Sequence, residues 1–181
     1  EVFISTYICH PSLANDNLSG PSLVTYLAKY IQDIKNKKYS YRIIFVPETI
    51  GSIAYINKNL KVLKKRVIGG YVLTCIGDNR SFSYLNSKYG NSFSDFCAKE
   101  TFGKLKIKYK NYSFLFRGSD ERQFNSPGID IPIGSIMRTK YGEYPEYHTS
   151  LDNFNLVTEK GLKGGFYIAK KIVENMQSKK D

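Results

Sequence analysis

The sequence predicts an α/β fold, a three-layer αβα sandwich in which helices cover both faces of a central sheet. Three observations lead to this prediction. Apolar, β-branched runs of strand length recur along the chain, and segments with helical periodicity follow several of them. A chain of 181 residues, 41% of them hydrophobic, is also long enough to bury one full core. Alternation of strands with helices is typical of this class.

The first half of the chain carries the clearest strand and helix signals. Pro21 stands where a helix can begin, with Ser19 or Gly20 as its cap, and apolar residues follow at helical spacing. Pro47 ends an apolar strand, because proline has no N–H to donate to a sheet. The elements predicted here are strands over 2–9, 41–46 and 71–76 and helices over 21–35 and 51–56.

The second half of the chain is less regular. Residues 81–103 are aromatic and polar without clean periodicity, and loops are expected at 118–131 and 142–152. Gly161 and its neighbouring glycines weaken the first turns of the closing helix. The elements predicted here are an irregular helix over 93–102, strands over 105–109, 112–117 and 133–137, and a closing helix whose apolar face runs from Leu162 to Met176.

The charge balance is strongly basic, with a net charge of +11. Such a balance can indicate nucleic-acid binding, but the basic residues are scattered lysines without a helix-turn-helix, RNP-like or finger motif. No apolar run approaches the roughly 18 residues of a membrane span, and we expect no signal peptide. We therefore expect neither nucleic-acid nor membrane binding.

Three widely spaced cysteines, Cys9, Cys75 and Cys97, favour thiols over disulfides. Cys9 and Cys75 fall in apolar strand patterns, so we expect them to be buried and reduced. Reduced thiols favour a cytoplasmic protein.

Polar residues follow three of the predicted strands. His10 and Asp16 come after the first, Glu48 after the second and Asp78 after the third, and His148 lies in a later polar loop. Ligands bind at the carboxyl ends of strands in open α/β sheets. Imidazoles and carboxylates there suit a zinc-like ion, with Glu48 as a general base beside it. A hydrogen-bonded turn or a helix cap is the alternative role for each acid.

Four motifs in order along the chain resemble those of zinc aminopeptidases of the bacterial leucyl and Streptomyces type. They are Asn15-Asp16-Asn17-Leu18-Ser19-Gly20, Gly51-Ser52-Ile53-Ala54-Tyr55, Ser119-Asp120 with Phe124 and Gly128, and His148-Thr149-Ser150-Leu151-Asp152. The resemblance implies a mixed, mostly parallel central sheet.

A closer resemblance is to bacterial proteins associated with polysaccharide biosynthesis that carry an aminopeptidase-like domain. It rests on the segments 47–52 and 142–150. Members of this group are longer, with additional amino-terminal sequence, a small inserted β domain and a winged-helix-like carboxyl end. We therefore expect residues 1–181 to be a single aminopeptidase-like domain and a fragment of a longer chain.

The resemblance implies roles for the polar residues. Asp16 matches a carboxylate that bridges two zinc ions, His10 and Asp78 match ligands of the first ion, and His148 matches a ligand of the second. Glu48 matches the first glutamate of a pair, the general base, but Thr49 stands where the second glutamate is usual. The zinc count therefore stays open between two ions and one, the latter held by Asp16, Glu48 and His148 as in the related glutaminyl cyclases.

Four further residues are candidates for supporting roles. Asp120 is expected to be structural, and Asp152 to cap a helix or to accept a hydrogen bond from His148. Tyr144 and Tyr147 either line a substrate pocket or pack within its wall.

The resemblance implies a zinc-dependent hydrolase of peptide or other amide bonds, in which Glu48 deprotonates a metal-polarised water. Its substrate would be a small peptide or an amide of a surface-polysaccharide pathway. Two alternatives stay open: a non-catalytic binding domain and a single-zinc, cyclase-like transferase. The sequence does not indicate an oligomeric state.

Overall fold

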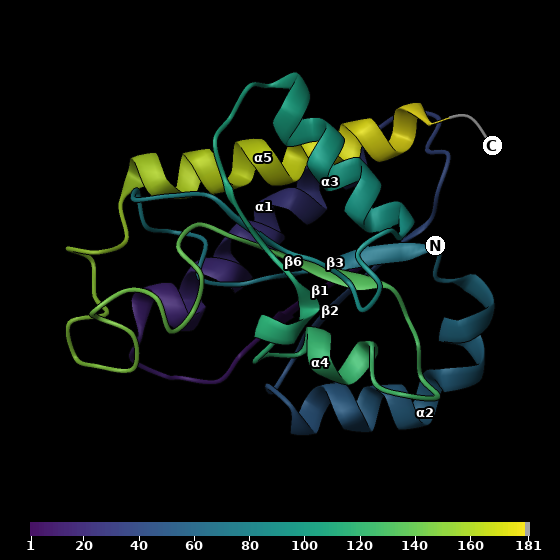
Figure 1. Ribbon diagram of the computed structural model, residues 1–181, viewed down its shortest axis with the longest axis horizontal. Helices are drawn as coiled ribbons and strands as arrows, with labels where there is room; N and C mark the ends of the chain where they lie inside the picture. Colours follow the sequence, from purple (N-terminus) through teal and green to yellow (C-terminus); the bar gives the residue numbers. More distant parts are fainter. Residues whose placement is uncertain (180–181) are drawn as a thin grey trace.

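The computed structural model describes residues 1–179, and one six-stranded sheet runs through its centre (Figure 1). The strand order is β2-β1-β3-β6-β4-β5. Only β4 and β6 pair antiparallel, and the other four neighbouring pairs are parallel, so the sheet is mixed and mostly parallel. The strands are β1 Val2–Tyr7, β2 Tyr41–Val46, β3 Gly69–Leu73, β4 Ser83–Leu85, β5 Lys110–Tyr112 and β6 Ile133–Met137.

Helices cover both faces of this sheet, as the three-layer prediction requires (Figure 1). α1, α3 and α5 lie on one face, where Leu27, Phe102 and Ile172 belong to the larger core. α2 and α4 lie on the other face, where Leu63 and Phe124 belong to a second core. The helices are α1 Ser19–Asp33, α2 Ile50–Arg66, α3 Phe93–Lys104, α4 Glu121–Phe124 and α5 Glu159–Ser178, with a π-helical turn η1 over Ala14–Leu18 and a 3-10 turn η2 over Phe114–Phe116.

The glycines at the start of α5 let this helix approach the end of β3. A β-carbon on Gly161 would lie 1.9 Å from the carbonyl oxygen of Gly77, and one on Gly165 would lie 2.6 Å from that of Ile76. Any larger residue would push the helix away. The glycines that lower helix propensity therefore have a packing reason, and the predicted closing helix is α5, Glu159–Ser178.

The other large differences from the predicted elements concern α2 and the strands around residue 110. α2 continues to Arg66 because Leu63 extends its buried face well past the predicted end at Ile56. The predicted strands 105–109 and 112–117 are wrong, since only the short β5 pairs there. Tyr109 instead stacks on Phe102, with ring centroids 4.1 Å apart, so aromatic side chains suggested strands where the chain packs as a loop.

Smaller differences remain, and one of them is that the strand predicted over 71–76 is β3, Gly69–Leu73. β4 was not predicted, and a single turn, α4, lies in the predicted loop 118–131. Strands β2 and β6 match their predicted bounds, whereas β1 ends two residues early, at Tyr7.

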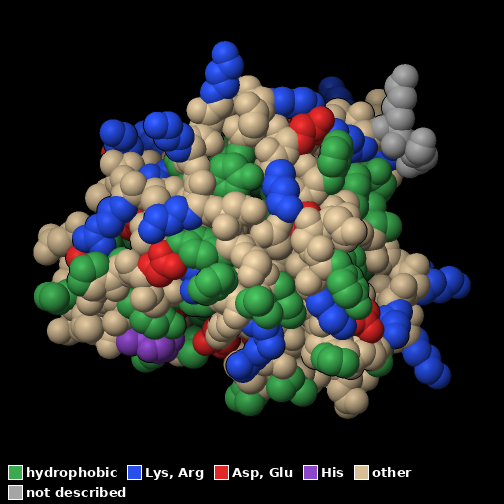
Figure 2. Space-filling model, in the orientation of Figure 1, with side chains coloured by type: hydrophobic (Ala, Val, Ile, Leu, Met, Phe, Trp, Pro, Cys, Tyr) green, Lys and Arg blue, Asp and Glu red, His purple; other side chains and the backbone are tan. Residues whose placement is uncertain are grey.

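Basic side chains on the face shown in Figure 2 stand in separate small groups. Several lie where local structure favours them: Lys64, Lys65 and Arg66 occupy the last turn of α2, where a positive charge interacts favourably with the helix dipole. Within residues 1–179, no helix is both long enough and apolar enough to cross a membrane.

Candidate metal centre

The site begins where β1 ends, in the loop that leads to α1. Asn17 holds this loop: its Oδ1 accepts hydrogen bonds from the backbone N–H groups of Cys9 and His10, and its Nδ2 donates to the carbonyl oxygen of Tyr7. Asn15 ties the same loop to the end of β3 by accepting from the N–H of Gly77. The backbone that carries His10 and Asp16 is therefore fixed from two sides.

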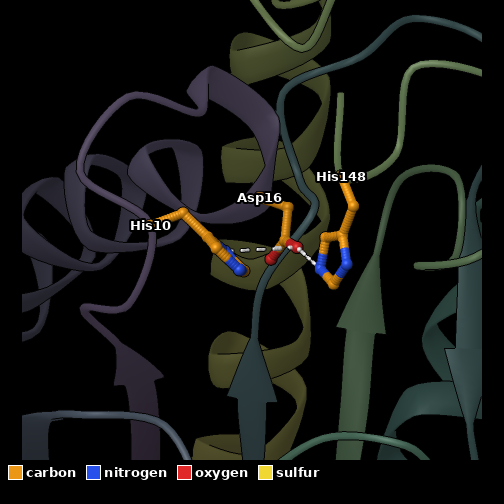
Figure 3. Close-up of side chains that lie close together, drawn as sticks. All are labelled: His10, Asp16 and His148. Atoms are coloured by element: carbon orange, nitrogen blue, oxygen red, sulfur yellow. Dashed lines mark ion pairs between the residues drawn. The ribbon is translucent and has the colours of Figure 1, made fainter. Parts of the chain in front are cut away.

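His10, Asp16 and His148 converge at this point (Figure 3). Oδ2 of Asp16 lies 3.5 Å from Nδ1 of His10 and 3.1 Å from Nε2 of His148. The three ligand atoms lie within 4.8 Å of one another. Asp16 is buried, whereas His148 is exposed, so the cluster opens to solvent on the His148 side.

Tyr147 supports His148. The two rings stack with centroids 3.8 Å apart and planes 18° apart, and Tyr147 packs edge-on against buried Tyr144. His148 itself has a φ of 57°, a left-handed conformation that residues with a β-carbon adopt rarely. Tyr147 therefore lies in the wall of the site, and Tyr144 lies behind it with its hydroxyl on Sγ of Cys75.

Glu48 follows β2 and lies beside this cluster. Its Oε1 accepts a 2.6 Å hydrogen bond from the hydroxyl of Ser119. Partial burial raises the pKa of Glu48, and the nearby carboxylate of Asp16 raises it further, against the lowering effects of Ser119, His10 and Cys9. A raised pKa makes Glu48 a better proton acceptor than an ordinary exposed glutamate.

Cys9 corrects one prediction. It is exposed rather than buried, because β1 ends at Tyr7 and Cys9 already belongs to the loop. The predicted burial of Cys75 is confirmed, and Cys97 is buried as well. The Cys9 side chain contacts Glu48, and its Sγ lies 4.0 Å from Nε2 of His10, so this thiol borders the site.

Asp120 holds the start of α2. Its Oδ1 accepts from the N–H of Thr49 and from the hydroxyl of Ser52, while its buried Oδ2 has no hydrogen-bond partner. Burial raises the pKa of Asp120 to about 6. Thr49 has a φ of 59°, so Asp120 stabilises an unusual backbone next to Glu48.

Both oxygens of Asp78 and both oxygens of Asp152 accept hydrogen bonds from other groups. Asp78 accepts from the N–H and hydroxyl of Thr139 and from the N–H of Arg80, and the structure does not bring it into the His–Asp cluster. The carboxylate oxygens of Asp152 accept from the N–H groups of Asn15 and Asp16. Asp152 thus caps the turn that carries Asp16.

Sequence reasoning missed three residues of the site: Tyr7, Asn17 and Ser119. Asn17 and Ser119 lie within motifs that were singled out for their neighbours, so the motif itself was a usable signal. Tyr7 offered none, because its place in an apolar strand predicts a core side chain. Its hydroxyl nevertheless donates a 2.7 Å hydrogen bond to Oδ1 of Asp16.

The residues present fit a zinc ion. Ligand atoms about 2.1 Å from a tetrahedral ion lie about 3.4 Å from one another, close to the two distances measured from Oδ2 of Asp16. Nδ1 of His10 is buried without a hydrogen-bond partner, and it faces this carboxylate. An ion between these atoms would satisfy it.

Comparison with known proteins places the chain in a family. Residues 1–179 match a family model described as a domain of unknown function, DUF4910. The chain belongs to this family. A curated protein of Clostridium acetobutylicum, described as a polysaccharide biosynthesis protein with an aminopeptidase-like domain, is 40% identical over 178 residues. The match covers 98% of this chain but only 40% of that protein, so the chain spans well under half the length of this relative.

Solved structures show the same fold. A crystal structure from Clostridium acetobutylicum has a TM-score of 0.93 at 40% identity, over 97% of this chain and 41% of that one. The zinc aminopeptidase BSAP from Bacillus subtilis has a TM-score of 0.79 at 20% identity, over 99% and 46%. A glutaminyl cyclase from an Acidobacteriales bacterium has a TM-score of 0.76 at 14% identity, over 98% and 70%. The aminopeptidase-like fold and the predicted resemblance are therefore confirmed.

Proposed function

We propose that this domain is a zinc-dependent hydrolase of peptide or other amide bonds. The observation that carries the proposal is the meeting of the only two histidines in the sequence, His10 and His148, at the buried carboxylate of Asp16. His10 and Asp16 follow β1, whereas His148 lies in the loop between β6 and α5. In this proposal the three side chains hold zinc, and Asp78 has a structural role.

Glu48 is the proposed general base. When bound, zinc supplies Lewis-acid polarisation of a carbonyl and of an attacking water. Glu48 takes the proton of that water and passes it to the leaving amine. Ser119 holds the carboxylate of Glu48 through its hydroxyl hydrogen bond, and partial burial keeps the affinity of this carboxylate for a proton high.

The substrate class follows from the chemistry of the site and from the named relative. A small peptide or an amide can reach the exposed side of the cluster at His148. Because the relative is named for polysaccharide biosynthesis, we include an amide of such a pathway among the substrates. A cytoplasmic location belongs to the same proposal, and the free thiols of Cys75 and Cys97 support it.

Thr49 favours a second candidate function. Glu48 is followed by Thr49, whereas the zinc aminopeptidases that this chain resembles carry two adjacent glutamates. One carboxylate serves poorly as both a tight ligand and a free base. The alternative is therefore a domain that binds a metal and a partner but cleaves no bond in that partner. A cyclase that closes the ring of an amino-terminal glutamine is the other form of this alternative.

The test compares wild type with Glu48→Gln on a panel of aminoacyl nitroanilides, with zinc content measured on the same samples. We expect Glu48→Gln to keep its zinc and to lose about 100-fold or more in kcat. Wild-type kcat should fall in acid with an apparent pKa above the usual value of about 4.3 for glutamate, because the base must be deprotonated. The matched control is Glu159→Gln, an exposed carboxylate on α5.

Three results would count against this proposal. Full activity in Glu48→Gln would remove Glu48 as the base. The binding domain would be favoured if wild type binds zinc but neither this chain nor a full-length family member hydrolyses any substrate of the panel. Ring closure of amino-terminal glutamine without hydrolysis would favour the cyclase.

A further inference from the structure

The two oxygens of the Asp16 carboxylate face different surroundings. Oδ2 makes the contacts with both histidines, at 3.5 Å from His10 and 3.1 Å from His148. Oδ1 accepts the hydroxyl of Tyr7 at 2.7 Å. The histidines thus share one oxygen, and a phenol takes the other.

Tyr7 is fixed in this arrangement. Its side chain is buried at the end of β1, and the hydroxyl of Thr74 donates to the Tyr7 oxygen at 2.6 Å. Because Thr74 supplies a proton to that oxygen, the phenol's own proton points to Asp16. Tyr7 therefore holds Oδ1 in a hydrogen bond and, by orienting the carboxylate, presents Oδ2 to the histidines.

A carboxylate that bridges two metal ions needs the opposite arrangement. The ions of a two-metal site lie about 3.5–4 Å apart, so each oxygen must face its own ion and each ion its own histidine. Here both histidines contact the same oxygen. Across residues 1–179, moreover, His10, Asp16 and His148 form the only group of three His, Cys, Asp or Glu side chains close enough together to hold an ion.

We propose that this centre holds a single metal ion, bound through Oδ2 of Asp16, and that Tyr7 is the residue that positions this carboxylate. This inference rests on the proposed function only in taking the cluster as a metal site. It favours one ion over two, with His10 in place of the Glu48 that the one-ion alternative from the sequence included. Tyr7 does not touch the ion in this arrangement, and it acts through the carboxylate of Asp16.

The test measures zinc stoichiometry and affinity for the whole chain. Metal-free protein is titrated with zinc against a chromophoric chelator, the bound ions are counted by native mass spectrometry, and cobalt substitution reports the coordination geometry. Wild type should bind one ion. Tyr7→Phe should bind about 10- to 100-fold more weakly, as is usual when a partner that orients a ligand is removed. Its cobalt spectrum should also change.

Two further variants separate positioning from damage to the fold. Tyr71→Phe removes the hydroxyl of another buried tyrosine, one that donates to the carbonyl oxygen of Ser94 and not to Asp16, and it should leave affinity unchanged. Thr74→Val removes only the donor to Tyr7 and should weaken binding less than Tyr7→Phe. Circular dichroism confirms that each variant is folded.

The outcomes distinguish this inference from the proposed function. Two zinc ions per wild-type chain would overturn the single-ion centre and leave the hydrolase proposal standing. No bound zinc in wild type would overturn both. The role of Tyr7 would be overturned if folded Tyr7→Phe binds one ion with the zinc affinity and the cobalt spectrum of wild type.

Discussion

Asp16 and Asp78 are two buried acids at the same edge of the sheet with very different surroundings. Each comes after a parallel strand, Asp16 after β1 and Asp78 after β3, and each is at most 1% exposed. Asp16 leaves one oxygen to two histidines. Asp78 gives both oxygens to protein donors, Thr139 and the backbone of Arg80.

The difference shows that burial at a strand end does not by itself make a carboxylate a ligand. A metal ion needs a lone pair that no N–H or O–H already occupies. Asp78 joins the loop after β3 to the segment after β6 and stabilises the fold. Asp16 is fixed through its backbone by Asp152, so its side chain stays available.

The largest effect we predict separates these two acids. Asp16→Asn should weaken zinc binding by more than about 100-fold, because it removes the anionic ligand from the centre. Asp78→Asn should leave zinc affinity within about threefold of wild type. It should lower the free energy of unfolding by about 1–3 kcal/mol, because the new amide N–H₂ group cannot accept the hydrogen bonds that the lost carboxylate oxygen accepted. Chelator competition measures the first effect, and urea unfolding of the metal-free protein measures the second.

An equal loss of zinc affinity in both variants would break the comparison and return Asp78 to the ligand set. If Asp78→Asn unfolds too readily to titrate, Thr139→Val provides a milder control. It removes one donor to Asp78 and leaves its charge.

The sequence predicted most of the fold because the determining signals are local. Apolar strands bounded by proline or glycine gave β2 and β6 their bounds. A place after a predicted strand, or in a motif, indicated His10, Asp16, Glu48 and His148. The hydrogen-bond partners of each side chain, by contrast, come from residues distant in sequence. The donor to Asp78 is Thr139, from the end of another strand, and no local pattern announces it.

Asp120 is intermediate between Asp16 and Asp78, and it leads to a prediction on how stability depends on pH. One of its oxygens is satisfied, the other is buried without a partner, and its pKa is about 6 in the fold. The unfolded pKa is about 3.9, so folding takes up a proton and wild type loses stability as pH rises from about 4 to 6. Asp120→Asn does not titrate, so its stability relative to wild type should rise over this interval by up to about 3 kcal/mol.

Urea unfolding at pH 4, 5, 6 and 7 measures this difference. Asp130→Asn is a matched control, because Asp130 is paired with Lys88 at the surface and its pKa is lowered. A difference between Asp120→Asn and wild type that does not change with pH would show that Asp120 is ionised throughout this range in the folded protein.

The smallest effect we predict concerns Tyr147, which supports a histidine rather than a carboxylate. His148 is exposed and lies in a loop with a left-handed backbone, so regular structure does not fix its ring. Stacking on Tyr147 limits the positions available to that ring. Replacing Tyr147 with Leu should cost about 1 kcal/mol of zinc binding, since aromatic pairs contribute about 0.5–1.5 kcal/mol.

Tyr147→Phe should retain the affinity of wild type, because the stack depends on the ring and not on the hydroxyl. Tyr167→Leu, on the exposed side of α5, should have no effect. If Tyr147→Phe binds zinc as weakly as Tyr147→Leu, the hydroxyl rather than the stack holds His148. The two sides of the centre would then be alike, each ordered by a tyrosine hydroxyl, Tyr7 for Asp16 and Tyr147 for His148.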